Sequence, residues 1–517
     1  NRLSKTTVIY LHHISGSIQG ISPQQRVFQL STESMNINTN WDKMNKELNF
    51  TGNIIMIGCG SIGQAILPLL GRHLDGIYNR LTVLSANESG RRMAQASGAK
   101  FIHSIFTPGN YRTILKEYVG EGDLLLNLSI GVSSLDLIRF CAEQGALYVD
   151  TSIEPWPGVF GDPMLELHER TNYIIRSKAL DLAKELGPDS PTAVIDHGAN
   201  PGLVSHFVKR ALADLNQIIR KENTMPSSRE GWADLARDLG ITTIQISERD
   251  TQASHKPKRQ GEFINTWSID GFVDELMQPA ELSIGTSEKR IPGGACEHNP
   301  GSGTLYLERP GASTFARSWV PSIGGFQGML VTHDEVMSIA DYLSVRNEDS
   351  FLYRPTVMFV YHPCDDAMLS ALELEGSGWV LQASARRLGP DIVEGTDELG
   401  VLLAGHERNA YWYGSQLGIE EARRHVDYAN ATTIQVTAGA IAAILWAIKN
   451  PRRGIVEPED LDFEDCLETA IPYLGRMVSE FTEWTPLDGR GKYFPEKLDV
   501  QSPWQLQNIR SRQYYGE

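Results

Sequence analysis

Between residues 50 and 151, short apolar runs alternate with longer segments that have the length and composition of helices. The predicted strands are 53–57, 81–84, 100–103, 124–130 and 146–151. The predicted helices are 64–73, 88–97 and 134–143. Because parallel strands are joined by helical crossovers and are buried on both faces, this alternation predicts an α/β fold with a Rossmann-like, doubly wound parallel sheet.

The pattern changes after residue 200. Four strand-like runs, joined by long loops rich in glycine and proline, predict a second, α+β domain built on a mixed sheet: 242–246, 304–307, 317–321 and 356–361. The loop 291–303 holds four glycines and two prolines, a composition typical of functional or disordered loops. The run 434–448 has no proline and a single glycine, so it predicts a long buried helix.

A glycine-rich motif follows the first predicted strand and opens the first predicted helix. Gly58, Gly60 and Gly63 form GxGxxG, the fingerprint of a dinucleotide site. Gly58 allows the tight turn, Gly60 lets the backbone approach a pyrophosphate, and Gly63 allows close helix–strand packing. A tight turn without a ligand is the alternative, but the full β–α–β context favours the dinucleotide site.

The second half of that fingerprint is incomplete. An acidic residue normally ends the second strand and holds the adenosine ribose, whereas this chain has Ser85 there. NAD, with Asn87 or Glu88 compensating, is the first hypothesis. NADP held by Arg91 or Arg92 is the rival, although the spacing of these arginines is also that of a solvated helix face.

The chain is acidic and carries few cysteines. It has 47 Lys and Arg against 64 Asp and Glu, a formal net charge of −17, which argues against binding of nucleic acids or anionic membranes. The longest nearly uninterrupted apolar run, 438–448, is too short to span a bilayer. Five scattered cysteines without a CxxC pair are typical of reduced thiols in a cytoplasmic protein and predict no metal site. The brief apolar patch 8–14 does not have the pattern of a signal peptide.

A series of longer motifs carries a family resemblance. They are GCGSIG (58–63), NLS (127–129), IEPW (153–156), GANPG (198–202), ERDTQ (248–252), NTWS (265–268), QPAEL (278–282), LVTH (330–333), YHPC (361–364), DELGVLL (397–403), NAYWYGSQ (409–416), EWTPL (483–487) and SPWQ (502–505). In their order and number they make the chain resemble the bacterial homospermidine synthase family, within the saccharopine dehydrogenase-like superfamily, over nearly everything after residue 50. The resemblance implies a homodimeric transferase that uses NAD as a recycled prosthetic group. NAD oxidises putrescine to an imine, a second putrescine displaces ammonia, and the same cofactor reduces the new imine to homospermidine. Spermidine is an alternative donor.

The resemblance also implies roles for particular residues. Asn200 is similar to a polar anchor for the inner amine, and His333 and Glu335 to a pair that binds this amine and relays its proton. Their spacing predicts that both side chains lie on one face of a strand. Trp267 resembles the ring that stabilises the imine cation through a cation–π contact.

Further carboxylates fit the same picture of a dicationic diamine. Glu248 and Glu275 resemble the family's groups for the outer amine and for proton transfer, and Glu154 and Asp397 an acidic entrance track. Cofactor binding is implied for Gly58, Gly60, Ser61, Ile62, Gly63, Ser85, Asn127, Ser129 and Thr151. Taken singly, such residues have ordinary structural explanations, and only the full set favours the functional interpretation.

The chain departs from the family pattern at two places. Relatives often carry Asp where this chain has Gly131, which removes one carboxylate from the entrance track, and Ser85 replaces the acid at the strand end. Two other hypotheses stay open. One is a saccharopine-dehydrogenase-like amine or amino-acid oxidoreductase with net redox change, and the other is an NAD-binding scaffold without turnover.

The expected organisation has four parts. Residues 1–44, rich in Ser, Thr, Asn and Gln, are a disordered leader in which Met35 or Met44 is a possible biological start. Residues 45–200 form the NAD-binding domain and 201–430 the substrate-binding and dimerisation domain. Residues 431–517 form a helical segment that packs back on both domains.

Overall fold

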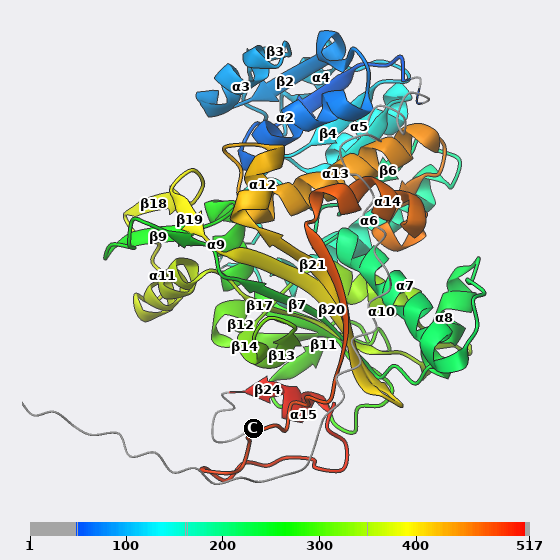
Figure 1. Cartoon of the computed structure of the whole chain (residues 1–517). Coiled ribbons are helices and arrows are strands. Elements are labelled where there is room, and N and C mark those ends of the chain that lie inside the picture. The colour runs from blue at the N-terminus through cyan, green and yellow to red at the C-terminus, as the bar shows by residue number, and fades with distance from the viewer. Residues whose placement is uncertain (1–47, 49, 161, 163, 349, 512–517) are drawn as a thin grey trace, which may run out of the picture. The chain divides into compact units, whose positions relative to one another are not determined.

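The predicted parallel sheet is present in the computed structural model, which describes residues 48, 50–160, 162, 164–348 and 350–511 (Figure 1). Its seven strands pair in parallel in the order β22-β6-β5-β4-β1-β2-β3. The strands are β1 (Ile54–Ile57), β2 (Leu81–Ser85), β3 (Lys100–His103), β4 (Leu124–Asn127), β5 (Leu147–Asp150), β6 (Ala193–Val194) and β22 (Ile455–Val456). The predicted leader, 1–44, lies outside the described residues.

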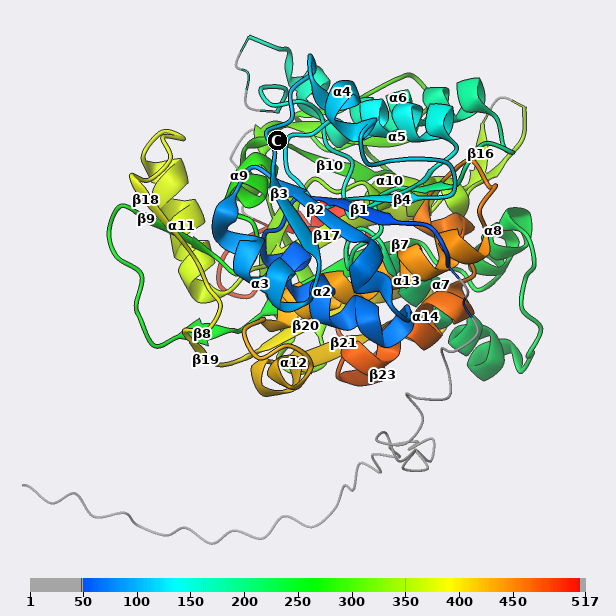
Figure 2. The same cartoon turned by 90° about the horizontal axis from the view of Figure 1, so that it is seen from above.

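The centre of this sheet is buried on both faces. Every residue of β1 and β4 is buried, as the continuous apolar runs predict. Figure 2 shows β3, β2, β1 and β4 side by side, with helix α2 (Ser61–His73) beside them. The strand order reverses between β1 and β4, and in open parallel sheets ligands bind at such a switch point.

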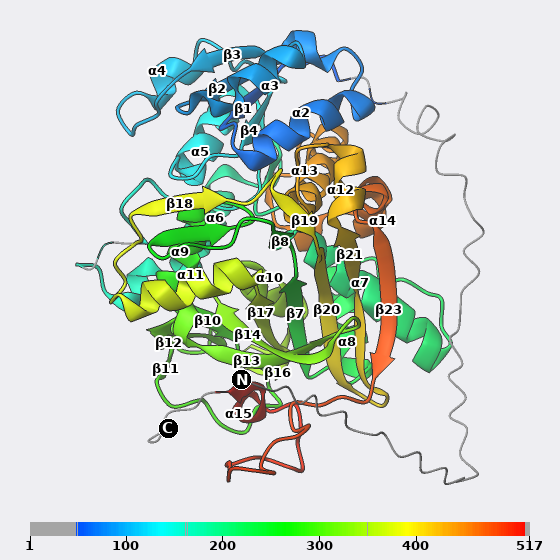
Figure 3. The same ribbon diagram turned by 60° about the vertical axis from the view of Figure 1, so that its left-hand side comes forward.

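The second sheet is mixed and has eleven strands. Its main path is β11-β12-β10-β17-β7-β20-β21-β23, with β14, β13 and β24 attached beside β17 (Figure 3). The strands are β7 (Thr243–Asp250), β10 (Pro279–Ser283), β11 (Ala295–Glu297), β12 (Thr304–Pro310), β13 (Phe315–Val320), β14 (Gly324–Val331), β17 (Thr356–His362), β20 (Thr396–His406), β21 (Asn409–Gly418), β23 (Arg476–Thr482) and β24 (Arg510–Ser511). β7 pairs in parallel with β17 and antiparallel with β20, so the expected mixed sheet is confirmed.

A long apolar helix, α13 (Ala431–Lys449), joins the two sheets. It contacts α2 and β5 on one side and β20 and β21 on the other. Its length and hydropathy would suffice to cross a membrane, but 89% of its most apolar window is buried inside the protein. It is therefore a core helix, as its sequence predicts.

Two elements differ from the predictions. The segment after residue 430 is not purely helical, because it supplies β22 to the parallel sheet and β23 to the mixed sheet. β22 has only two residues, and burial does not alternate regularly along β23, so periodicity detects neither strand. The glycine-rich loop 291–303 contains the strand β11, which pairs with β12, and it does not line the cavity described below.

Candidate active site

A cavity of about 700 Å³ lies at the carboxyl ends of β1, β4 and β5 and extends to the ends of β7 and β17. It brings together most of the residues that the sequence singles out. The predicted residues that line it are Gly58, Gly60, Ser61, Ile62, Ser85, Asn127, Ser129, Thr151, Glu154, Asn200, Glu248, Trp267, Glu275 and His333. Gly63, Glu335 and Asp397 lie behind this lining.

The glycine-rich loop forms one end of the cavity. Gly58 has φ +88°, and a Cβ there would lie 2.6 Å from the carbonyl oxygen of Leu128. A Cβ on Gly63 would lie 2.9 Å from the Gly58 carbonyl oxygen, whereas at Gly60 nothing lies within 4 Å. Helix α2 starts at Ser61 with no side-chain cap and no acidic residue in its first turn. Free backbone N–H groups beside open space fit a pyrophosphate.

The end of β2 determines what an adenosine ribose would meet. The Ser85 hydroxyl donates to the Asn87 carbonyl at 3.0 Å and accepts from the Asn87 N–H at 3.2 Å. Arg91 forms an ion pair with Glu88 and lies over the Phe101 ring, 4.5 Å from its centroid. Neither Arg91 nor Arg92 lines the cavity, so the arginines of the NADP hypothesis do not face this site.

At the end of β4, Asn127 is a structural organiser. Its side chain accepts a bond from the Ser129 hydroxyl at 2.6 Å and donates to the Tyr148 hydroxyl at 3.3 Å. The Tyr148 hydroxyl donates to Asp150 at 2.7 Å. These bonds fix the Asn127–Ser129 turn, which lines the cavity beside the glycine-rich loop.

Glu248, at the end of β7, is the centre of a buried polar group. It accepts a bond from the Asn200 side-chain amide at 2.7 Å. Burial and the charge of Asp397 hold the pKa of Glu248 well above its usual value, and burial raises that of Asp397 to about 6. The two carboxyls interact directly, and burial is the largest cause of the raised pKa of each.

Asp397 corrects one prediction. It has no exposed surface, accepts a bond from the Thr432 hydroxyl and lies behind Glu248. An entrance track needs exposed carboxylates, so Asp397 does not belong to one. Its position on β20, directly beside β7, explains why it acts on Glu248 instead.

His333 is held between two carboxylates. Its Nε2 lies 3.2 Å from Glu275 Oε1 and its Nδ1 lies 3.1 Å from Glu335 Oε1. Burial lowers the pKa of His333, but the charges of Glu335 and Glu275 outweigh it and hold this pKa well above its usual value. The ring is therefore an imidazolium that donates to both neighbours.

The backbone arrangement that brings His333 and Glu335 together differs from the predicted strand. His333 follows β14 in a loop, and Glu335 is the first residue of α10 (Glu335–Tyr342), so the two do not share a strand face. The loop brings the side chains into direct contact nevertheless. Spacing in the sequence does not distinguish these two geometries.

A row of aromatic rings forms one wall. Trp267 packs edge-on against Phe272 with centroids 5.8 Å apart, and Phe272 packs edge-on against Tyr361 at 6.0 Å. Tyr361 stacks on Phe359 at 5.4 Å, and Phe359 contacts His333. Trp267 lines the cavity, so its ring lies within reach of a bound cation.

Glu154 and a second carboxylate, that of Asp274, line the cavity at another side. Glu154 Oε2 accepts a bond from the Gly131 N–H at 3.2 Å, and burial together with the charge of Asp274 raises the pKa of Glu154 to about 8. Gly131 has φ +72°, and a Cβ there would lie 3.0 Å from the ring of Pro157. The backbone conformation and Pro157 thus leave little room for a larger side chain at this position.

Sequence reasoning missed several lining residues, which are Asn172, Asp274, Gln278, Asp334, Phe359, Tyr361 and Thr432. Tyr361 was detectable in principle. It ends a predicted strand of the mixed sheet, and the carboxyl ends of neighbouring parallel strands meet at one edge. Asp274 directly precedes Glu275 on helix α9 (Ile269–Met277).

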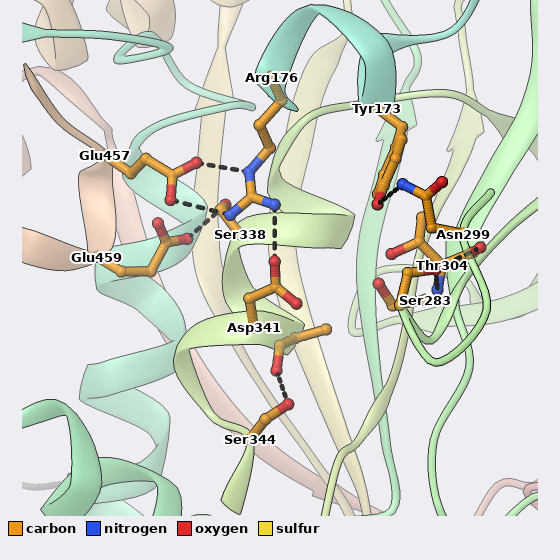
Figure 4. A network of polar contacts seen from close by, with 12 residues as sticks. Tyr173, Arg176, Ser283, Asn299, Thr304, Ser338, Asp341, Ser344, Glu457 and Glu459 are labelled. Carbon is orange, nitrogen blue, oxygen red and sulfur yellow. Dashed lines mark hydrogen bonds and ion pairs between the residues drawn. The ribbon is translucent and has the colours of Figure 1, made fainter. Parts of the chain in front are cut away.

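A buried ion-pair network fixes helix α10, which carries Glu335 (Figure 4). Arg176, on helix α6 (Asn172–Leu186), binds Glu457 through Nε at 2.6 Å and Asp341 through Nη1 at 2.7 Å. On α10, Ser338 donates to Glu459 at 2.9 Å. Three chain segments are thereby tied together behind the His333–Glu335 pair.

One group of side chains outside the cavity has the composition of a metal site. Ligating atoms of His197, His206 and Cys466 lie within 4.8 Å of one another and are buried. The two imidazoles, however, are hydrogen-bonded Nε2 to Nε2 at 2.8 Å, and His197 Nδ1 bonds to the Gly439 carbonyl at 3.0 Å. This arrangement is that of two neutral, hydrogen-bonded core histidines.

Comparisons with known families cover both sheets. Residues 54–194 match the saccharopine dehydrogenase NADP binding domain, and residues 198–482 match the saccharopine dehydrogenase C-terminal domain. The boundary between the two matches, 194–198, falls immediately before the GANPG segment and between β6 and β7.

Similar proteins agree with this assignment. Homospermidine synthase of Blastochloris viridis is 48% identical over 467 residues, which are 89% of this chain and 98% of that protein. The enzyme of the same name from Mesorhizobium japonicum is 44% identical over 92% of this chain and 99% of its own length. The crystal structure of a Legionella pneumophila homospermidine synthase in complex with NAD has a TM-score of 0.84 and 42% identity, covering 89% of this chain and 98% of its own. The chain therefore belongs to the homospermidine synthase family, a branch of the saccharopine dehydrogenase-like proteins.

Proposed function

We propose that the protein is a homospermidine synthase, which transfers a 4-aminobutyl group from putrescine or spermidine to putrescine and releases ammonia. The observation that carries this proposal is the arrangement of one cavity, in which a dinucleotide loop faces carboxylates, an imidazolium and an indole. The identity to homospermidine synthases supports it.

The proposed cofactor is NAD, which when bound accepts a hydride from the donor and later returns it to the new imine. Gly58, Gly60 and the first turn of α2 would hold the pyrophosphate, and Ser85 and Asn87 the adenosine ribose. Binding of the 2′-phosphate of NADP needs a free cationic side chain. Arg91 forms an ion pair with Glu88 and so is not free, which supports NAD over NADP. The NAD complex of the Legionella relative agrees.

The proposed diamine site uses carboxylates because its ligand is a dication. Glu275 and Glu335 surround His333, and one oxygen of each carboxylate, Oε2, has no hydrogen-bond partner among the described residues. Glu275 lines the cavity, so its free oxygen is an acceptor for an ammonium group, whereas Glu335 lies behind the lining and acts through His333. Glu154 and Asp274 lie at another side of the cavity, and a bound dication would favour the ionised forms of both carboxyls.

Proton removal from the reacting amine is assigned to the Glu248–Asp397 pair. Hydride loss requires a neutral amine, and the carboxyls of this buried pair, whose pKa values burial raises above their usual values, are stronger bases than exposed carboxylates. Asn200 holds Glu248 in place through its 2.7 Å bond. Trp267 would then stabilise the imine cation without offering a nucleophile.

Two further properties belong to the proposal. A homodimer and a cytoplasmic location are expected from the family. All five cysteines are free, as in reduced proteins, which supports the location.

A second candidate is an amino-acid oxidoreductase with net redox change, which the names of the two matching domain families favour. It would have to bind an α-carboxylate. Two carboxylates, Glu275 and Glu335, flank His333 and would repel the α-carboxylate of an amino acid.

Product analysis separates these functions. Purified protein with catalytic NAD and putrescine as the sole amine should form homospermidine and ammonia in equal amounts, detected by mass spectrometry. No NADH should accumulate in proportion to turnover. Steady NADH formation without homospermidine would instead establish the oxidoreductase, and tight NAD binding without amine consumption would establish a scaffold.

A further inference from the structure

Tyr361 places an unpaired hydroxyl beside Glu248. It lies near the end of β17, opposite Glu248 in the parallel pairing of β17 with β7, so both side chains stand on the same face of the sheet. Tyr361 lines the cavity and is 2% exposed. Its hydroxyl has no hydrogen-bond partner among the residues that the structure describes.

The ring has little freedom to turn elsewhere. It stacks on Phe359 with an interplanar angle of 15° and meets the edge of Phe272. Its backbone is pressed against β14, where a Cβ on Gly328 would lie 2.7 Å from the Tyr361 carbonyl oxygen. A buried hydroxyl without a partner is destabilising, because it gives up its hydrogen bonds to water and gains none in return. A fixed, unpaired hydroxyl on a residue that lines the cavity and is paired with Glu248 across the sheet indicates a group arranged for a ligand.

The hydroxyl remains a neutral phenol. Burial and the charges of Glu248, Asp250 and Asp397 hold the pKa of Tyr361 well above its usual value. A phenol donates one hydrogen bond and accepts others at the same oxygen. It is therefore able to take a proton at one lone pair while it gives up its own.

The proposed function, on which this inference rests, contains one step that needs such a group. When the second diamine adds to the imine cation, one carbon carries two nitrogens, and the positive charge sits on the attacking one. Ammonia leaves only after a proton has moved to the other nitrogen. Direct transfer between two nitrogens on one carbon passes through a strained four-membered ring.

We propose that the Tyr361 hydroxyl carries this proton. The attacking nitrogen gives its proton to the phenol oxygen while the phenol proton passes to the leaving nitrogen. The carbon–nitrogen bond to that group then breaks, ammonia departs with the bonding electrons, and the carbon forms a new imine cation with the remaining nitrogen. Tyr361 ends as it began, the net charge stays at one positive unit, and no oxidant or reductant is consumed.

The test is Tyr361→Phe, which keeps the ring stacking and removes the oxygen. General acid–base groups contribute typically ~10²- to 10⁴-fold, so homospermidine formation should fall at least about 100-fold. Reduction of bound NAD by putrescine in the first turnover should change much less. The variant should therefore accumulate reduced cofactor during steady state, visible in near-ultraviolet absorbance, whereas wild type does not.

Stability provides a second, independent readout. Removing an unpaired buried hydroxyl should leave the melting temperature of the cofactor-free protein unchanged or raised. Tyr353→Phe is the matched control: this buried hydroxyl donates to the Ile241 carbonyl at 2.8 Å away from the cavity, so its loss should lower stability and leave the cofactor signal as in wild type.

The outcomes are distinguishable. If wild type forms no homospermidine, the proposed function fails. If wild type is active, two results for Tyr361→Phe overturn the proton-carrier role. One is an equal loss of NAD reduction and of homospermidine formation, and the other is no loss of either. In wild type, the single-turnover reoxidation of the reduced cofactor should slow in D₂O with a curved dependence on deuterium content, as two protons move together. An unchanged rate would also overturn the role.

Discussion

Trp267 tests whether a cationic intermediate forms beside an aromatic face. A desolvated cation–π contact is worth about 2 kcal/mol, which corresponds to roughly 30-fold in rate. We expect Trp267→Ala to lower kcat by about this factor or more and Trp267→Phe to retain part of the activity. NAD affinity, measured by calorimetry, should stay unchanged because the cofactor is assigned to Gly58, Gly60, Ser85 and the first turn of α2, and not to Trp267. Equal kcat values for Trp267→Ala and wild type would contradict the role.

Gly60 separates cofactor binding from folding. Nothing lies within 4 Å of a Cβ at this position, and its φ of −74° lies outside the left-handed region that favours glycine. Gly60→Ala should therefore unfold at the wild-type temperature without ligand but bind NAD at least about tenfold more weakly, because the methyl group occupies the space meant for the pyrophosphate. Gly109→Ala, also in open space but outside the cavity, is the control. Unchanged NAD affinity in Gly60→Ala would place the pyrophosphate elsewhere.

Glu335 controls the charge of His333. Because the pKa of His333 is raised in the folded protein, its ion pairs stabilise the fold fully below the unfolded value of about 6.5, and this contribution disappears as pH rises through the raised pKa. We expect Glu335→Gln to shift the His333 titration to lower pH, followed by NMR of the imidazole in the cofactor-free protein. Stability should then become less dependent on pH above neutrality. A titration that does not move would show that Glu275 alone sets the charge.

At the scale of elements, α13 holds the Asn200 loop in position. Gly439 lies so close to Gly198 that a Cβ there would lie 1.9 Å from the Gly198 carbonyl oxygen. Gly439→Ala should thus displace the 198–202 loop, lowering stability by at least about 1–3 kcal/mol and kcat/KM through Asn200. Gly376→Ala, at the end of helix α11 (Asp365–Gly376) with nothing within 4 Å, should be neutral or stabilising in thermal denaturation. Equal effects of the two substitutions would contradict the packing argument.

The sequence predicts elements well where burial makes the pattern one-sided. The strand 100–103 and the buried helix around 434–448 are found with correct or nearly correct bounds, because apolar runs of these lengths have few alternatives. The sequence also predicts the glycine-rich loop, because a GxGxxG motif between a strand and a helix adopts one geometry. The His333–Glu335 contact and the burial of Asp397 were not predictable, because a loop and a neighbouring strand determine them. The unpaired Tyr361 hydroxyl also emerges only from tertiary packing.

At the scale of the molecule, the net charge of −17 has a partial structural explanation. Carboxylates gather around one cavity, where Glu154, Asp274, Glu275 and Glu248 lie with a single imidazolium nearby. Burial raises the pKa of each of these acids, so they are costly in the free protein and gain from a bound cation. The acidity of the chain thus matches a dicationic ligand at the site, while most of the remaining charge lies elsewhere.

The segment after α13 joins the two sheets into one folding unit. It supplies β22 to the parallel sheet and β23 to the mixed sheet, and the buried Arg176–Glu457 pair links it to α6. Neither sheet is complete without it, so we expect a single cooperative thermal transition in calorimetry. NAD at about 100 times its Kd should shift this whole transition, by about 2.7 kcal/mol of added stability. Two resolved transitions, with only one moved by NAD, would show that the sheets unfold independently. In that case Arg176→Met, which leaves Glu457 unpaired, should affect the transition of one sheet alone rather than lower a common one.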